Sequence, residues 1–300
     1  MNEQKETENE EKKQKISRRD FLKLMMSAGG LTFLAGLGGW KYIVQAEQEK
    51  LELVELSLRL PHLDASFDGL KIAVVGDIHF GNWMTRERLI PAVDLILEQS
   101  PDLIFHTGDF LAGYGWTAEH KIYLKDLTLE LKRLSKNIVN IAVMGNHDYW
   151  TNPIAVRESL QEANIIELSN TFYTLKRGTA QLHICGVDDI WEKKNDLNAL
   201  LMELPAGAPA ILLAHEPDFA DVSASTNRFS LQISGHSHGG QVVIPGYGAP
   251  IRSYMGWKYY SGLYKVGEMW QYTNRGIGMG RIPIRYNCRP EITLLTLETE

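Results

Sequence analysis

The chain has 300 residues, 44% apolar and 23% charged, which is enough to bury a sizeable core and excludes a mostly disordered chain, a collagen-like chain and a polytopic membrane protein. The 31 basic residues are outnumbered by 37 acidic ones, so the net charge of −6 argues against a broadly basic nucleic-acid-binding surface. The two cysteines, Cys185 and Cys288, are too few for a disulfide framework or a thiolate zinc site, and a single disulfide between them stays open.

The first 46 residues differ in composition from the rest. Residues 1–14 are almost wholly Glu, Lys, Gln and Asn, and we expect them to be disordered. Residues 17–23 read SRRDFLK, and residues 24–40 carry no charge but five glycines, a run shorter than the roughly 20 residues of a membrane-spanning helix. Together they resemble a bacterial twin-arginine (Tat) signal. We therefore expect residues 1–46 to be a disordered stretch plus signal peptide, and residues 47–300 to form a single domain.

This resemblance implies a place for the protein in the cell. It implies export of the folded chain by the Tat machinery, to a secreted, cell-wall or membrane-anchored location outside the cytoplasmic membrane. Ala46 is an acceptable cleavage site, and an uncleaved anchor of the same topology is the alternative. Residues 47–300 carry 23 basic and 31 acidic residues, a net charge of −8, so no nucleic-acid partner is expected.

The first half of the expected domain alternates strands and helices. Residues 51–60 alternate apolar and polar side chains, which predicts a half-buried strand. Short apolar runs predict buried strands, and helical spacing of apolar residues predicts two helices between them. The strands are expected at 71–75, 103–105 and 138–144, and the helices at 86–99 and 118–136. The alternation indicates a βαβαβ unit with a mainly parallel sheet.

The second half is richer in strands. They are expected at 172–175, 181–186, 210–213, 229–233, 241–244, 258–266, 269–273 and 291–297, with short helices at 195–203 and 219–225. The whole pattern predicts an α/β fold: a four-layer α-β-β-α sandwich of two mixed sheets flanked by helices.

Five polar clusters each follow a predicted strand and lie next to glycine, alanine or proline. They are Gly76-Asp77-Ile78-His79, Gly108-Asp109, Gly145-Asn146-His147-Asp148, Ala214-His215-Glu216-Pro217 and Gly235-His236-Ser237-His238-Gly239-Gly240. The carboxyl ends of strands in an α/β sheet converge on one crevice, so these clusters are expected to meet. The pairs spaced i, i+2, Asp77/His79 and His236/His238, would point the same way on extended backbone, and each pair would then hold one centre.

The side chains of these clusters are typical of a metal site. The candidate ligands are Asp77, His79, Asp109, Asn146, His215, His236 and His238. Imidazole and oxygen ligands without thiolate suit Mn, Fe, Zn or Co. Seven ligands fit two divalent ions that share one carboxylate, the arrangement that stabilises in-line displacement at phosphorus.

The order D-x-H, G-D, G-N-H-D, a lone His and G-H-x-H resembles the calcineurin-like metallophosphoesterases. Tyr260–Tyr264, Arg275-Gly276 and Glu291–Leu294 resemble an exported bacterial phosphodiesterase branch related to UDP-2,3-diacylglucosamine pyrophosphatases. The resemblance implies a hydrolase of phosphoester bonds, most of all diesters, in which two metal ions activate a water or hydroxide for in-line attack at phosphorus.

The resemblance also assigns roles to the residues that match its motifs. It places Asp77, His79, Asp109 and His238 on the first metal. Asp109 bridges to the second metal, which also takes Asn146, His215 and His236. His147 is then a catalytic residue that protonates the leaving oxygen, and Asp148 orients it through the other ring nitrogen.

Several alternatives remain at this level. The substrate is a small-molecule or lipid-linked phosphoester, with membrane or cell-wall association as one option. A pyrophosphatase acting on a UDP-linked glycolipid and a phosphomonoesterase are the alternative activities. A non-catalytic scaffold is disfavoured because no ligand is missing. Aromatic side chains in loops either form a substrate rim or simply pack, and these are Trp83, Tyr114, Trp116 and Trp150. The histidines outside the motifs read as ordinary core or surface residues, with His106 a candidate to line the site, and these are His62, His106, His120 and His183.

Overall fold

The computed structural model describes residues 23, 36, 38–39, 47–280 and 282–300. The predictions of a disordered stretch and a twin-arginine signal therefore lie outside the described residues. Among the described residues, no helix combines the length and the apolar character needed to cross a membrane. The chain divides into two units, Met1–Ile43 and Val44–Glu300, and the second contains all the elements that follow.

The first sheet has six strands, and its centre is parallel. The order is β1 (Glu52–Leu60), β12 (Glu291–Thr299), β2 (Leu70–Val75), β3 (Leu103–His106), β4 (Val139–Ala142) and β5 (Ile166–Glu167). Strands β2 to β5 run parallel, while β12 runs antiparallel to β2 and parallel to β1. The last strand of the chain thus lies between the first two.

The second sheet also has six strands. The order is β10 (Gly262–Val266), β11 (Met269–Thr273), β9 (Leu231–Ser234), β8 (Ala210–Leu213), β7 (Ala180–Gly186) and β6 (Thr171–Arg177). Strands β7, β8, β9 and β11 are parallel, and β6 and β10 close the two edges as antiparallel partners. Both sheets are therefore mixed, as predicted.

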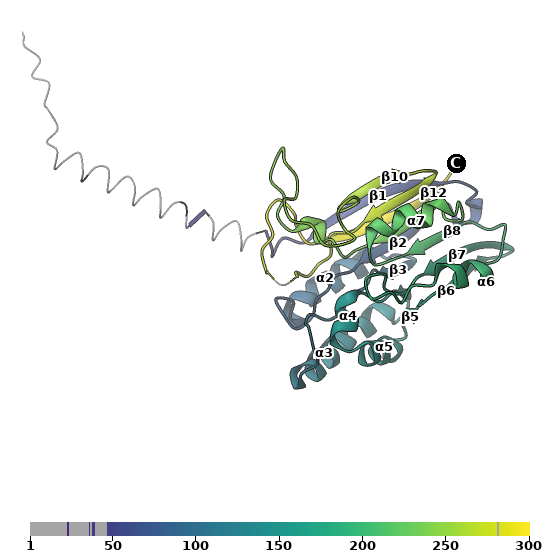
Figure 1. Ribbon diagram of the computed structural model, residues 1–300. Coiled ribbons are helices and arrows are strands. Elements are labelled where there is room, and N and C mark those ends of the chain that lie inside the picture. The colour runs from purple at the N-terminus through teal and green to yellow at the C-terminus, as the bar shows by residue number, and fades with distance from the viewer. Residues whose placement is uncertain (1–22, 24–35, 37, 40–46, 281) are drawn as a thin grey trace, which may run out of the picture. The chain divides into compact units, whose positions relative to one another are not determined.

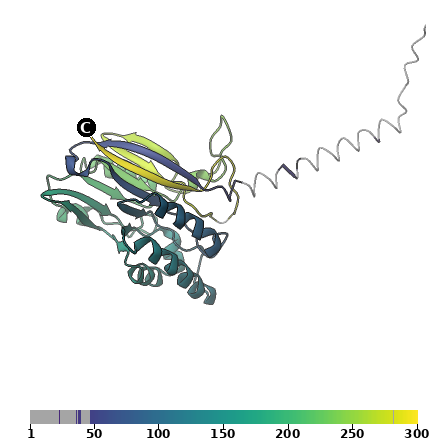
Figure 2. The ribbon, with the colours of Figure 1, turned by 180° about the vertical axis from the view of Figure 1, so that it is seen from behind.

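The sheets pack face to face, with helices on both outer faces (Figures 1 and 2). In β2, Ile72 and Val74 point into the core between the sheets, whereas Ala73 and Val75 point to the helices, which explains the unbroken apolar run. The first sheet is covered by α2 (Arg86–Glu98), α3 (Ala118–Ser135) and α5 (Pro153–Glu162), and the second by α6 (Leu197–Glu203) and α7 (Ala220–Ser225). The predicted four-layer α/β sandwich is confirmed. Short helical turns complete the described unit: η1 (Ala65–Phe67), α4 (Asn146–Thr151), η2 (Pro217–Phe219) and η3 (His238–Gly240).

Three local predictions are corrected. Residues 241–244 form no strand, because Gln241 has a left-handed backbone (φ 55°) and only isolated bridges follow it. The strand expected at 258–266 begins only at Gly262. Helix α5 was not expected, although its start carries a recognisable signal: Asn152 caps it and Pro153 opens it.

Cys185 and Cys288 are both buried and free, so the disulfide left open above does not form.

Candidate metal centre

The five motif clusters lie in the loops that follow β2, β3, β4, β8 and β9, at the edge of the molecule where these strands end (Figure 1). The loops after β2 and β3 continue side by side past the strand ends: the N–H of Asp77 donates to the carbonyl oxygen of Gly108 (2.9 Å), and that of His79 to the carbonyl oxygen of Asp109 (3.0 Å). This pairing fixes the candidate ligands of the first two motifs relative to each other.

Six of the seven candidate ligands fall into two buried groups that share one member. Asp77, His79, Asp109 and His238 form the first group, and Asp109, His215 and His236 form the second, with the ligand atoms of each group within 4.8 Å of one another. Asp109 Oδ2 lies 3.4 Å from His79 Nε2 and 3.3 Å from His215 Nε2. One carboxylate oxygen therefore faces both groups.

The two i, i+2 pairs behave differently from each other and from the prediction. Asp77 and His79 join the same group, but His236 and His238 separate into the two groups, so the expectation that each pair holds one centre is wrong for the second pair. The i, i+2 rule assumes extended backbone, and neither pair has it, because the φ angle is positive at all four positions; the spacing alone therefore does not decide which side chains share a group. Five candidate ligands have positive φ angles: Asp77 (48°), His79 (47°), Asp109 (55°), His236 (68°) and His238 (51°).

Backbone carbonyl groups orient two of the imidazole rings. His215 Nδ1 donates to the carbonyl oxygen of Thr107 (2.6 Å), which leaves Nε2 toward Asp109. His236 Nε2 donates to the carbonyl oxygen of Tyr254 (2.7 Å), which leaves Nδ1 toward His215. A ring nitrogen held in this way fixes which nitrogen faces the group. In His236, whose pKa burial lowers, that nitrogen keeps its lone pair. In His215, burial opposes the charged form, but Asp109 and other nearby carboxylates outweigh it and raise the pKa well above its usual value, so a metal ion would displace a proton there.

Asn146, the seventh candidate, stands at the first turn of α4. Its side chain is buried, and its Oδ1 has no hydrogen-bond partner among the described residues. Burying a polar oxygen without a partner lowers the stability of the fold, so this atom indicates that a hydrogen-bond donor or a metal ion binds here.

Burial and neighbouring charges together set the pKa values of the candidate ligands. Burial lowers the pKa of His79 to about 3 and also lowers the pKa of His236 and His238, so these imidazoles keep free lone pairs. Burial and the nearby Asp109 charge raise the pKa of Asp77 to about 7. Burial opposes ionisation of Asp109 as well, but the neighbouring histidines, His215 first, hold its pKa well below the usual value.

His147 differs from the other candidates because it is only half-buried. Its backbone N–H donates to Asp109 Oδ1 (2.9 Å), and its ring lies edge-on to that of His79, with centroids 4.6 Å apart. Its Nδ1 lies 3.1 Å from the carbonyl oxygen of Gly113. His147 also lines a cavity of about 340 Å³ together with His79 and Tyr114. It therefore stands beside the first group with its ring toward open space.

Asp148 does not contact the ring of His147, so the expected orienting contact is wrong. Its carboxylate instead accepts four backbone N–H groups, from Gly145 (3.0 Å), Asp109 (3.0 Å), Phe110 (2.8 Å) and Leu111 (3.2 Å). Burial and the charge of Asp109 raise the pKa of Asp148 to about 7, against the four donors, which favour the ionised form. Asp148 thus ties the loop of Asp109 to the start of α4.

An aromatic rim borders the site on the side of His147. Tyr114 stacks on Trp150 with ring centroids 5.3 Å apart, and both rings contact His147. The other two aromatics considered for this role pack elsewhere: Trp83 lies under the guanidinium of Arg88, and Trp116 stacks on His120.

One rim residue, Trp191, and the buried carboxylate that holds its loop were missed as functional residues in the sequence. Trp191 contacts Trp150 (5.1 Å between centroids), His236 (5.6 Å) and Tyr254 (5.1 Å), which extends the rim from the first group to the second. The buried carboxylate of Glu216 accepts the N–H of Trp191 (2.9 Å) and so holds this loop in place. Glu216 directly follows the candidate ligand His215, and this neighbourhood is the only feature of the sequence that could have pointed to its role.

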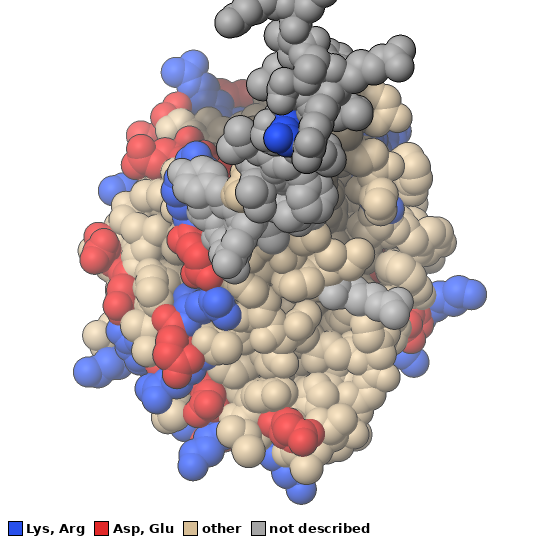
Figure 3. Space-filling model, turned by 90° about the vertical axis from the view of Figure 1, so that its left-hand side faces the viewer, with Lys and Arg blue, Asp and Glu red and all other residues tan. Residues whose placement is uncertain are grey.

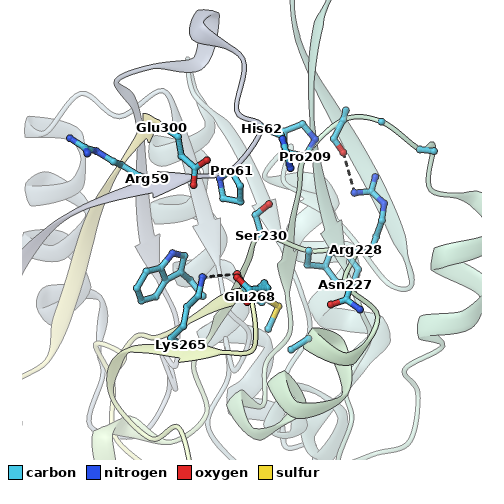
Figure 4. A pocket seen from close by; sticks show the side chains of 17 residues that line it. Arg59, Pro61, His62, Pro209, Asn227, Arg228, Ser230, Lys265, Glu268 and Glu300 are labelled. Carbon is cyan, nitrogen blue, oxygen red and sulfur yellow. Dashed lines mark hydrogen bonds between the residues drawn. The ribbon is translucent and has the colours of Figure 1, made fainter.

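The histidines outside the motifs take no part in either group. His106 bonds to Asn140 (2.8 Å) inside the first sheet, His183 to Thr174 (2.9 Å), and His120 to Thr117 at the start of α3. His62 lines a larger cavity of about 770 Å³ (Figure 4), together with Pro209 and Ser230, which precede β8 and β9. That cavity therefore lies at the end of the sheets opposite the candidate metal centre.

A model of the calcineurin-like phosphoesterase family matches residues 70–240, which include every candidate ligand. The chain belongs to this family. It is accordingly a hydrolase that acts on phosphoester bonds, and its family is metal-dependent.

The chain is 34% identical over 287 residues to the metallophosphoesterase YkuE of Bacillus subtilis (strain 168), covering 95% of this chain and 99% of YkuE. It is 29% identical over 288 residues to the phosphodiesterase YaeI of Escherichia coli (strain K12), covering 94% and 99%.

Among solved structures, the protein TT1561 of Thermus thermophilus is similar at 14% identity with a TM-score of 0.47, over 70% of this chain and 90% of that one.

The residues present fit a divalent metal. The first group offers two carboxylates and two imidazoles, a donor set that suits Mn, Fe, Zn or Co. The pKa of both imidazoles is lowered, so their nitrogens are free to bind a metal ion, and outside this group the ring of His236 and the unpaired Oδ1 of Asn146 offer further donor atoms. His79 Nε2 and His238 Nε2 also lie 3.0 Å apart, as two nitrogens that face the same centre do.

Asp148→Asn is expected to lower the free energy of unfolding by about 1–3 kcal/mol, because the new NH₂ group would face two of the four backbone donors instead of accepting from them. Denaturant unfolding measures the change. Asp126→Asn, on the surface helix α3, is the control and should change stability by no more than about 0.5 kcal/mol. Unchanged stability of Asp148→Asn would contradict the tethering role.

Proposed function

We propose that the protein is a phosphodiesterase whose centre holds two divalent ions. The observation that carries the proposal is Asp109, whose carboxylate belongs to both ligand groups. Asp77, His79 and His238 would complete the first site, while Asn146, His215 and His236 would complete the second. Such ions supply Lewis acidity at the phosphoryl group. The relative named a phosphodiesterase, YaeI, supports a diester as the substrate.

His147 is the residue that we propose to move a proton. Its Nδ1 donates to the carbonyl oxygen of Gly113, so Nε2 is the nitrogen available to the substrate. The acid is the doubly protonated ring, in which Nε2 carries a second proton. As the bond between phosphorus and the leaving oxygen breaks, this proton passes to that oxygen and leaves a neutral ring with its Nδ1–H on Gly113. The cavity that His147 shares with His79 and Tyr114 gives the leaving group a place to lie.

Asp148 acts on this chemistry through position. Its four hydrogen bonds fix the loop that carries Asp109 and the first turn of α4, which carries Asn146 and His147. We propose that these bonds hold the carboxylate of Asp109 and the ring of His147 at a fixed distance from each other. This role replaces the direct contact between Asp148 and the His147 ring that the family resemblance implied.

The shared carboxylate makes a prediction about metal content. Asp109→Asn is expected to lower occupancy of both sites, whereas His215→Ala should mainly empty the second, since His215 belongs to one group only. Metal analysis of the full chain after saturation with manganese measures this. His183→Ala, a buried histidine outside both groups, is the control and should keep the wild-type content. A single ion per wild-type chain would reject the binuclear proposal.

Loss of His147 should depend on the leaving group. His147→Gln is expected to lower kcat by about 10²–10⁴-fold on an alkyl phosphodiester, because an alkoxide needs a proton to leave. A nitrophenyl diester should lose less, because nitrophenolate leaves unassisted. Metal content should stay at the wild-type level. An equal loss on both substrates would leave His147 only a role in charge stabilisation, and loss of metal would make it a ligand.

We also propose export by the Tat machinery, with the protein secreted, in the cell wall or held at the outer side of the cytoplasmic membrane. The support is the motif SRRDFLK at residues 17–23. Replacing Arg18 and Arg19 together with lysine is expected to retain active protein in the cytoplasm, measured by cell fractionation. Unchanged export of this double variant would rule out the Tat route. The substrate in that location would be a small-molecule or a lipid-linked phosphoester.

A further inference from the structure

The segment between η3 and β10, residues 241–261, exposes an unusual set of large apolar side chains; we call it the apolar loop. Five of the fourteen exposed large apolar residues in the described part of the chain lie within it, between 43% and 79% exposed. They are Ile244, Tyr247, Ile251, Tyr254 and Trp257. Ile282, also exposed, adjoins the loop, because its carbonyl oxygen accepts from the side chain of Gln241 (2.8 Å). Single exposed apolar residues are ordinary, but a cluster of this kind marks an interaction surface.

The apolar loop carries two cations and no acidic residue: Lys258 pairs with Asp221 of α7 (2.7 Å), whereas Arg252, among the described residues, bonds only to carbonyl oxygens of the loop and is left to attract an anionic partner. Residues 222–267 contain no Asp or Glu, although the whole chain has a net charge of −6. The guanidinium of Arg252 lies over the ring of Tyr260 (4.1 Å to the centroid), so a cation stands among the aromatic side chains of the loop. Figure 3 looks onto this end of the molecule, and the part of the face left visible has a wide centre without charged side chains.

The apolar loop also lies beside the candidate metal centre. The carbonyl oxygen of Tyr254 accepts from the ring of His236, and the Tyr254 ring packs on Trp191 of the rim. A surface that bound this loop would therefore stand next to the opening of the site.

The chain enters the domain at the same edge. Glu52, the first residue of β1, pairs with Glu291, and two residues further along β12, Thr293 pairs with Val74 at the end of β2. Glu47 contacts the N–H of Asn287, and Gln48 donates to the carbonyl oxygen of Pro283 (2.5 Å). The start of β1 therefore lies at the same edge of the first sheet as the candidate metal centre, and the uncharged residues 24–40 precede it in the sequence.

We propose that the apolar loop, together with Ile282, docks on the surface of a lipid bilayer. Tyrosine and tryptophan beside aliphatic side chains and a cation are the composition that binds at the interface between headgroups and acyl chains. Anionic headgroups match the acid-free sequence around the loop. Docking in this way turns the metal centre toward phosphoesters at the membrane surface, and this last step rests on the proposed phosphodiesterase function.

The test uses the full chain with Leu31→Glu and Leu34→Glu, so that residues 24–40 do not themselves bind lipid. In this background, Tyr247→Ser and Ile251→Ser change the apolar loop. Met202→Ser is the matched control, because Met202 is 82% exposed on α6, away from the loop. Sedimentation with vesicles of phosphatidylcholine, with and without phosphatidylglycerol, measures binding. Turnover of a soluble phosphodiester is measured in parallel.

We expect the background protein to bind vesicles, more strongly when phosphatidylglycerol is present. Each loop substitution should weaken binding by about tenfold or more, because a fully buried side chain of this size contributes at least that much. Met202→Ser should bind like the background protein. None of the three substitutions should alter turnover of the soluble diester, because none lies among the proposed ligands or in the rim.

Three outcomes would overturn the proposal. One is no vesicle binding until residues 24–40 are restored, which would make that segment the lipid-binding element. Another is equal binding by the loop variants and Met202→Ser. The third is a lower mass of the loop variants in light scattering without lipid, which would make a second copy of the chain the partner. Failure of the metal-loaded wild type to turn over the soluble diester would instead reject the proposed function and leave the vesicle result standing.

Discussion

The carboxylate of Asp109 is the interaction on which the site depends. Its Oδ2 lies between His79, which follows a strand of the first sheet, and His215, which follows a strand of the second. Its Oδ1 accepts the N–H of His147. The backbone at the start of α4 lies directly against this carboxylate. A Cβ on Gly145 would lie 2.3 Å from Oδ1, so only glycine allows this close approach. Both sheets are thereby joined through one buried anion.

The left-handed backbone of five candidate ligands adds a second constraint. Each such residue costs about 1 kcal/mol relative to an ordinary conformation, and it persists only where the surroundings determine it. Here the surroundings are two aligned loops, the four hydrogen bonds of Asp148, and the carbonyl groups of Thr107 and Tyr254. The strain is therefore offset by contacts that the loops make with one another.

The sequence predicted most of the fold and the gathering of the ligands, for a simple physical reason. Parallel strands deliver their carboxyl ends to one edge, so apolar runs ending in Asp, Asn or His locate the site without coordinates. Contacts made by backbone or across loops leave no such pattern. The four backbone N–H groups that bind Asp148, and the contact between the rings of Trp191 and His236, depend on how separate loops approach each other. Gln241 shows the same limit, since its neighbours Val242 to Ile244 are strand-like, yet its left-handed backbone ends the extended run.

Strand β12 carries a consequence for the order in which the molecule is assembled. It follows every other strand of the domain in the sequence, yet it fills the place between β1 and β2 and pairs with both along most of its length. Until residues 291–299 emerge, β1 has no partner for its whole length and β2 lacks one neighbour. Contacts between residues so far apart in sequence close slowly, because a long loop of chain must be ordered first. The first sheet, which supports the metal centre, therefore stays open during synthesis of all the other strands and becomes complete only when residues 291–299 have been made and have paired.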